Sequence, residues 1–207
     1  MGDQADIHVK ILTASSTDEL MQVYDGWAER YDQDLLDDWG YSSPETAVHL
    51  LQEAMVTSDL HVLDAGCGTG LVGVLLKDAG VSSITGIDYS PGMLARAEMK
   101  GVYDALHTMD MNKALNLPSD CFDAVTCIGT FTSTHVKPSA LRELIRVTRP
   151  GGVLVFTVRD DYWRETLFMD LVAELHIMTK IEVEQIRLEP YIHSEGSKCR
   201  VVVLRAV

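Results

Sequence analysis

The stretch Val62-Leu63-Asp64-Ala65-Gly66-Cys67-Gly68-Thr69-Gly70 decides how this chain folds. Apolar residues are followed by an aspartate and by three glycines at alternate positions, after which Leu71 to Ala79 has helical spacing and is closed by Gly80. This order predicts a strand, a tight turn and a helix. The three glycines allow backbone angles that a Cβ would forbid, and they let a ligand approach the main chain closely. An ordinary tight turn does not require three glycines, so the stretch indicates a ligand-binding loop.

The rest of the chain repeats this alternation of strand and helix. Strand patterns occupy residues 60–63, 83–87, 105–109, 122–128, 153–158, 182–192 and 199–206. Helical spacing occupies residues 17–38, 42–55, 71–79, 91–97, 138–148 and 161–178. Strands that alternate with helices form parallel sheets, and the link 193–197 joins the last two strands like a hairpin. The sequence therefore predicts an α/β fold with a mostly parallel, seven-stranded, Rossmann-like sheet, an antiparallel edge hairpin and helices on both faces.

Composition limits the domain count and the partners. The 207 residues are 46% hydrophobic, which suits a single domain over 1–207, with an N-terminal helical arm (1–40) ahead of a core (41–207). No apolar run reaches the roughly 18 residues of a membrane span and the first residues lack a secretory pattern. We therefore expect no membrane contact and a cytoplasmic location, with the nucleus as an alternative. The net charge of −14 disfavours a nucleic-acid substrate, and the four cysteines lack metal-ligand spacing, so we expect reduced thiols and no metal site.

Two ligands compete for the glycine loop. Gly68-Thr69-Gly70-Leu71-Val72-Gly73 also spells the G-x-G-x-x-G of a dinucleotide site. However, this match begins four residues after Asp64 rather than at the strand end, and an aspartate there would repel a pyrophosphate. S-adenosyl-L-methionine (SAM) has no phosphate and presents a cationic ammonium and sulfonium, which a carboxylate attracts. The loop therefore favours SAM over NAD.

Acidic residues also end the next two strands. Asp88 closes the second strand, where its carboxylate can accept hydrogen bonds from both hydroxyls of an adenosine ribose. An alternative role for Asp88 is to stabilise the start of the helix at Ser90-Pro91 through the helix dipole. Asp110, with Met111 beside it, follows the third strand and is positioned to meet the amino group and the face of an adenine. These residues indicate a ligand that contains adenosine.

The segment from about residue 60 to 158 resembles the class I SAM-dependent methyltransferases. Leu63 to Gly70 matches the first motif of that family, and Leu144 to Gly152 is similar to its late motif. The resemblance implies the class I methyltransferase fold, SAM as the cofactor and S-adenosyl-L-homocysteine (SAH) as the product. We therefore predict cofactor contacts by Trp27, Tyr31, Asp64, Gly66, Cys67, Gly68, Asp88, Tyr89, Met93, Asp110, Met111 and Ile128.

The N-terminal arm extends this resemblance. Val23 to Asp32, together with Gly40-Tyr41, resembles the methyltransferase-like protein 27 group from the Williams-Beuren syndrome region. In such enzymes the arm folds over the bound cofactor, which implies that Trp27 and Tyr31 contact its methionine end. The alternative is that these aromatic residues are only the buried stripe of an amphipathic helix.

The implied chemistry needs few catalytic groups. Methyl transfer from a sulfonium is an in-line displacement from an activated donor, so neither a metal ion nor a covalent nucleophile is required. His135, after the fourth strand, is the candidate general base, which only a hydroxyl or a protonated amine acceptor would need. Tyr162 and Trp163 are candidates for the acceptor wall, although core packing is the more economical role for Trp163. The sequence thus predicts a SAM-dependent methyltransferase acting on a small-molecule or protein acceptor, with an NAD-dependent oxidoreductase and a SAM-binding module without turnover as alternatives.

Overall fold

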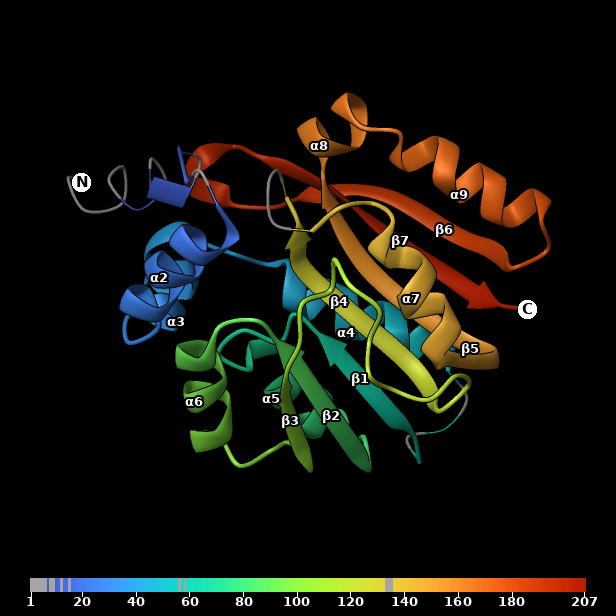
Figure 1. The fold of residues 1–207 in the computed structure, drawn as a ribbon, viewed down its shortest axis with the longest axis horizontal. Coiled ribbons are helices and arrows are strands. Elements are labelled where there is room, and N and C mark those ends of the chain that lie inside the picture. Colours follow the sequence, from blue (N-terminus) through green and yellow to red (C-terminus); the bar gives the residue numbers. More distant parts are fainter. Residues whose placement is uncertain are drawn as a thin grey trace.

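The computed structural model describes residues 7, 10, 11, 13, 14, 16–55, 57, 59–132 and 136–207. Within these residues, one sheet has the strand order β3-β2-β1-β4-β5-β7-β6 (Figure 1). The strands are β1 (His61–Ala65), β2 (Ser83–Asp88), β3 (Ala105–Thr108), β4 (Phe122–Phe131), β5 (Thr148–Arg159), β6 (Ile181–Pro190) and β7 (Lys198–Ala206). Strands β1 to β5 pair in parallel, whereas β7 runs antiparallel to both β5 and β6. The predicted parallel sheet with an antiparallel edge hairpin is therefore confirmed.

The central strands are buried on both faces. Residues 62–65 of β1 are all buried, and β7 contains the buried apolar run 201–204. Near-continuous apolar runs replace the alternation of a half-exposed strand because helices cover both sides of the sheet. Because the two-residue alternation is absent, the Gly and Asp residues that end these strands indicate them more clearly than hydrophobic periodicity does.

Helices lie on both sides of the sheet, as expected (Figure 1). α4 (Ser43–Ala54) and α5 (Leu71–Asp78) share one core with β1. α7 (Ala140–Val147) and α9 (Phe168–Ile177) share the other core. α6 (Pro91–Met99) packs against β2 and β3, and α8 (Asp160–Glu165) directly follows β5. Because β1 to β5 run parallel, their carboxyl ends meet at one edge of the sheet. Ligands bind at this edge in folds of this type.

The N-terminal arm differs from the single helix expected over residues 17–38. It consists of α2 (Thr17–Trp27), α3 (Tyr31–Gln33) and the π-helical segment η1 (Asp34–Trp39). The chain turns at residues 28–30, and Trp27 Nε1 then donates a buried hydrogen bond to Asp34 Oδ2 at 2.7 Å. In a continuous helix these two residues would lie about 10 Å apart along the axis. The prediction of one continuous helix was wrong because this tertiary contact requires the break.

The helix predicted over residues 161–178 is also interrupted. α8 ends at Glu165 and α9 begins at Phe168, so the expected apolar stripe through Leu167 does not form. Leu167 is 73% exposed, whereas Phe168 is buried and stacks on Trp163 with ring centroids 5.5 Å apart. Burial of the larger aromatic ring outweighs helical continuity here. Among the helices of the described residues, none combines the length and the apolar character needed to cross a membrane.

Candidate functional site

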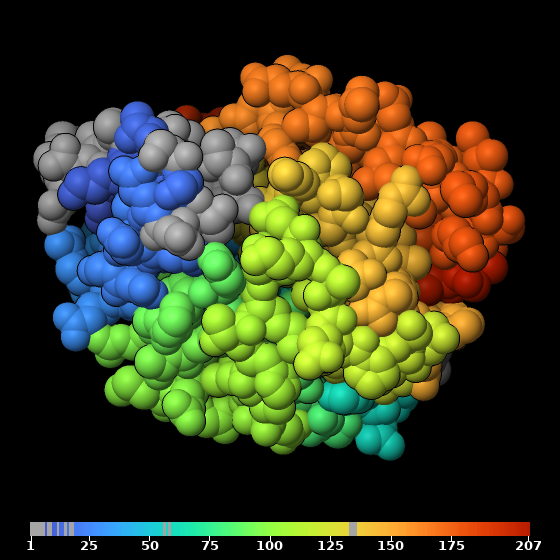
Figure 2. All heavy atoms as spheres, in the orientation of Figure 1, coloured from blue at the N-terminus to red at the C-terminus, as the bar shows by residue number. Residues whose placement is uncertain are grey.

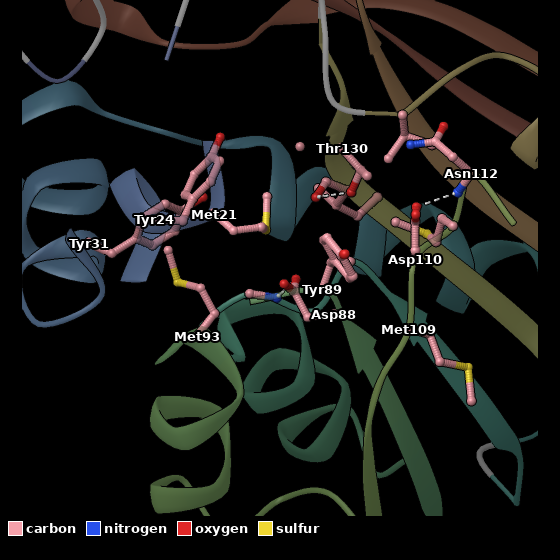
Figure 3. Close-up of a pocket in the computed structure, with 16 residues that line it drawn as sticks. Met21, Tyr24, Tyr31, Asp88, Tyr89, Met93, Met109, Asp110, Asn112 and Thr130 are labelled. Carbon is pink, nitrogen blue, oxygen red and sulfur yellow. Dashed lines mark hydrogen bonds between the residues drawn. The ribbon is translucent and has the colours of Figure 1, made fainter. Parts of the chain in front are cut away.

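A cavity lies at the carboxyl edge of the sheet, between the strands and the arm (Figure 3). Its empty volume, which includes space open to solvent, is about 690 Å³. Most of the predicted cofactor residues line it, namely Tyr31, Gly66, Gly68, Asp88, Tyr89, Met93, Asp110, Met111 and Ile128. Three of the predicted residues, Trp27, Asp64 and Cys67, are not part of the lining.

The glycine loop presents bare main chain to this cavity. Gly66 and Gly68 have positive φ angles of 72° and 53°, which side-chain-bearing residues adopt at a cost. A Cβ on Gly66 would lie 2.5 Å from Thr130 Oγ1, so β4 packs directly against the loop at this point. A Cβ on Gly68 would meet no atom within 4 Å. The loop therefore needs Gly66 for packing, whereas a Cβ on Gly68, which also lines the cavity, would meet no protein atom.

Asp88 lies at the end of β2 and holds the glycine loop through a hydrogen bond. Its Oδ2 accepts the Gly68 N–H at 2.8 Å and its Oδ1 accepts the Ser90 N–H at 2.9 Å. An ionised carboxylate can accept about four hydrogen bonds, so Asp88 retains acceptor capacity toward the cavity that it lines. Burial raises the pKa of Asp88 above its usual range, although the N–H groups of Ser90 and Gly68 oppose this rise. The side chain of Ser90, which accepts the Met93 N–H at 3.0 Å, caps α6.

The opposite wall is formed by the loop after β3. Asp110 Oδ1 accepts the Asn112 N–H at 2.9 Å, and Lys113 lies 3.2 Å from Asp110 Oδ2. Met109 and Met111 flank Asp110 in the chain, and Met93 lines the cavity from α6, on the side of Tyr24 and Tyr31 (Figure 3). Methionine side chains are flexible and polarizable, and they make favourable contacts with flat aromatic rings. This part of the cavity can therefore hold a planar ring beside an acidic group.

The arm supplies the third wall through Met21, Tyr24 and Tyr31. Burial raises the pKa of both tyrosines above their usual range, so their hydroxyl groups stay protonated at neutral pH. Trp27, which was also expected here, lies behind this wall and packs edge-on against Tyr31 with ring centroids 4.6 Å apart. Its indole N–H is already bonded to Asp34. The aromatic pair at the cavity is thus Tyr24 and Tyr31 rather than Trp27 and Tyr31.

Asp64 also differs from its expected surroundings, because its carboxylate lies behind the glycine loop. Asp64 is 1% exposed, and its two oxygens accept the Tyr103 hydroxyl at 2.7 Å and the Thr126 hydroxyl at 3.0 Å. Burial raises its pKa to about 6, while these two hydrogen bonds oppose the rise. Cys67 is buried on the same side of the loop, and burial raises the pKa of its thiol. The Asp64 carboxylate is therefore not part of the cavity wall.

The candidate acceptor residues have different outcomes. His135 lies outside the described residues. Tyr162 donates its hydroxyl to the carbonyl oxygen of Val136 at 3.1 Å, and Val136 lines the cavity. Trp163 is buried against Phe168, which supports a packing role.

The arm packs against the part of the chain that contains α6, and Figure 2 shows the blue N-terminal region beside the green one. Carboxylates of the arm make polar contacts there: Asp25 Oδ1 accepts the Ser90 hydroxyl and, at 2.9 Å, the Gly92 N–H at the start of α6. Asp32 accepts the Thr69 hydroxyl and pairs with Lys100 at 2.6 Å. These contacts join the arm to the glycine loop and to the turn after Asp88.

Sequence reasoning missed several lining residues, namely Met21, Tyr24, Met109, Asn112 and Val136. Tyr24 lies one helical turn before Trp27, so it belonged to the same aromatic pattern. Asn112 and Met109 adjoin Asp110 and Met111 in the chain. Proximity to a predicted residue was therefore the available signal for most of them, whereas nothing local distinguishes Met21.

The fold is that of a Rossmann-like α/β protein with a cavity at the carboxyl edge of its sheet. Residues 63–156 match the family described as "Methyltransferase domain". The chain belongs to the class I SAM-dependent methyltransferases.

Individual relatives agree with this assignment. Over 164 residues the chain is 35% identical to methyltransferase-like protein 27 of Homo sapiens, covering 76% of this chain and 66% of that protein. The chain spans two thirds or less of the length of the curated relatives it matches, down to 29% for one of them. A SAM-dependent methyltransferase from Mesorhizobium loti has the same fold, with a TM-score of 0.58, 20% identity and coverage of 78% of this chain and 99% of that one. The crystal structure of the [4+2]-cyclase SpnF also has this fold, with a TM-score of 0.68, 18% identity and coverage of 93% and 97%.

Proposed function

We propose that this chain is an enzyme that binds SAM in the cavity and transfers its methyl group to a small-molecule or protein acceptor. The observation that carries the proposal is the pairing of Asp88 with the Gly68 N–H at 2.8 Å. This pairing holds a carboxylate with free acceptor capacity beside a loop whose main chain is open to the cavity. SAM fits such an arrangement, because its ribose could bind the carboxylate while its extended methionine part lies along the open main chain.

The lining suits the separate parts of SAM. Asp88 would accept the ribose hydroxyls, and Asp110 would accept the amino group of adenine. Met93, Met111, Tyr89 and Ile128 would contact the faces of the adenine ring. Gly66 and Gly68 would allow close approach of the methionine part, and the hydroxyls of Tyr24 and Tyr31 would donate to its carboxylate.

The proposed reaction relies on alignment more than on acid or base chemistry. Bound SAM supplies a methyl group activated by its sulfonium. The arm would cover the reacting groups, exclude water and hold the acceptor in line, because Met21, Tyr24 and Tyr31 close one side of the cavity. His135 stays our candidate base for an acceptor that must lose a proton.

The acidic character of the chain and its free thiols support two further parts of the proposal. The net charge of −14 disfavours a nucleic-acid acceptor. All four cysteines are free thiols, which favours a reducing compartment such as the cytoplasm. Fractionation of cells that produce the tagged protein tests the location.

Binding of SAM and transfer of its methyl group need separate tests, because this fold alone does not define the reaction: a protein described as a [4+2]-cyclase also has it. Calorimetry with SAM, SAH and NAD should give micromolar binding of the first two and none of the third. Incubation with radiolabelled SAM and cell extract, split into small molecules and proteins, should then transfer label to one fraction. An Asp88→Ala variant is the control and should transfer none. Tight NAD binding without SAM binding would refute the proposal, and SAM binding without transfer to either fraction would reduce it to a SAM-binding module.

A further inference from the structure

Tyr103, in the link between α6 and β3, reaches under the glycine loop. A Cβ on Gly73 would overlap its hydroxyl, and a Cβ on Gly70 would lie 3.0 Å from its ring. On the sheet side, a Cβ on Gly86 would also lie 3.0 Å from the ring. Three glycines from α5, its N-terminus and β2 therefore leave the space that this one side chain occupies.

This packing accounts for Gly70 and Gly73 of the G-x-G-x-x-G spelling of residues 68–73 without a dinucleotide. In a dinucleotide site the last glycine allows close packing between helix and strand. Here Gly73 instead makes room for the Tyr103 hydroxyl.

The Tyr103 hydroxyl contacts the Asp64 carboxylate, whose ionised form is disfavoured by burial. It donates to Asp64 Oδ2 at 2.7 Å, and Thr126 donates to Asp64 Oδ1 at 3.0 Å. A buried carboxylate is stable in its ionised form only when such donors are present. Asp64 is two residues before Gly66, so its charge lies directly behind the loop at the cavity.

We propose that Tyr103 is a positioning residue for the cofactor site, which holds the Asp64 carboxylate behind the glycine loop and keeps it ionised at neutral pH. This inference rests on the proposed binding of SAM. An ionised Asp64 places a negative charge where it attracts a sulfonium but gives little to a neutral thioether. We therefore expect the Tyr103 hydroxyl to strengthen the binding of SAM more than the binding of SAH.

The groups around Asp64 set the direction of its pH dependence. Burial raises the pKa of Asp64, and the charge of Asp88 on β2 raises it further. Cys67 and Cys127 also face Asp64, and burial keeps both thiols neutral by raising their pKa. Tyr103 and Thr126 are the donors that lower the pKa of Asp64, so loss of the Tyr103 hydroxyl should raise it.

A double-mutant cycle with Tyr103→Phe and Asp64→Asn tests the inference. The phenylalanine keeps the ring that fills the glycine-lined space and removes only the hydroxyl. The urea unfolding of the cofactor-free wild type, both single variants and the double variant is measured at pH 5 and pH 7.5. Affinity for SAM and for SAH is measured by calorimetry at pH 7.5.

We expect Tyr103→Phe to lower the folding equilibrium constant more at pH 7.5 than at pH 5 when Asp64 is present. In the Asp64→Asn background, the same substitution should have equal effects at both pH values. We also expect SAM affinity to fall about tenfold and SAH affinity less than about threefold. A variant that is unfolded at pH 7.5 but folds at pH 5 would support the same conclusion.

Four outcomes would overturn the proposed role of Tyr103. In the unfolding measurements, these are equal destabilisation by Tyr103→Phe at both pH values, additive effects in the double variant, or a variant that is unfolded at both pH values. In the binding measurements, it is an equal loss of affinity for SAM and for SAH. If the wild type bound neither SAM nor SAH, the proposed function would fail, while the unfolding cycle would still decide whether Tyr103 controls the ionisation of Asp64.

Discussion

The Gly92 N–H donates to the Asp25 carboxylate at 2.9 Å and so joins the arm to the start of α6. A Cβ on Gly92 would lie 2.7 Å from the same oxygen, which means that only glycine permits this approach. The same Asp25 oxygen also accepts the Ser90 hydroxyl. Because Ser90 is two residues after Asp88, the arm is attached next to the proposed ribose site.

Replacement of Asp25 by alanine should loosen the arm. The change removes two hydrogen bonds that join the arm to Ser90 and Gly92, one of them exposed to solvent. We expect amide exchange in residues 17–39 to become at least about tenfold faster, with the rest of the chain unchanged. The matched control is Glu29→Ala, which removes an ion pair with Arg96 from a side chain that is 84% exposed and should have little effect. Equal exchange in the Asp25 variant and the wild type would show that the arm does not depend on this attachment.

Alanine substitution at two glycines of the loop should separate binding from folding. Gly68→Ala adds a methyl group that meets no protein atom, at a residue that lines the cavity, at a backbone cost of about 1–2 kcal/mol. Gly66→Ala pays a similar backbone cost and also collides with Thr130. We expect Gly68→Ala to weaken SAM binding more than about tenfold with a modest change in stability, and Gly66→Ala to lower the melting temperature more. The reverse order, measured by calorimetry and thermal unfolding, would contradict this assignment of the two glycines.

Replacement of Asp88 by alanine should abolish tight binding of both SAM and SAH. Two hydrogen bonds from ribose hydroxyls to a charged acceptor, at about 1.5–3 kcal/mol each, correspond to a loss of about 100-fold or more. Because both ligands carry the ribose, both should be affected alike. Calorimetry of a variant whose circular dichroism matches the wild type provides the measurement. Unchanged affinity in that folded variant would remove Asp88 from the site.

The buried Asp64 should make stability depend on pH in a defined window. Its pKa is about 6 in the folded chain, above the ordinary value of 3.8, so its protonated form is favoured by folding. The associated stability is complete below pH 3.8 and is lost as pH rises through 6. Relative to Asp64→Asn, the wild type should therefore lose roughly 3 kcal/mol of unfolding free energy across this window. Parallel urea titrations of both proteins between pH 4 and pH 7 test this, and a constant difference would contradict it.

Local patterns account for much of what could be predicted. The glycine spacing, the aspartates at strand ends and the alternation of strand and helix are each contained within a few residues. They were sufficient for the class of sheet and for placing Gly68, Asp88 and Asp110 at one cavity. The prediction for the aromatic residues of the arm was less accurate. Helical spacing groups Tyr24, Trp27 and Tyr31 together, but it does not show which of them line the cavity.

By itself, the sequence determined the class of fold, the ligand-binding loop and the acidic residues beside it, since these depend on backbone conformation and on neighbours along the chain. Tertiary structure alone decided that Trp27 turns to Asp34, that Asp64 lies behind the loop and that the arm attaches at Gly92. The Tyr103–Asp64 and Asp25–Gly92 contacts join residues 39 and 67 positions apart. No periodicity in a single chain encodes such pairs, because they arise only when separate elements pack and a buried charge or an open N–H must find a partner.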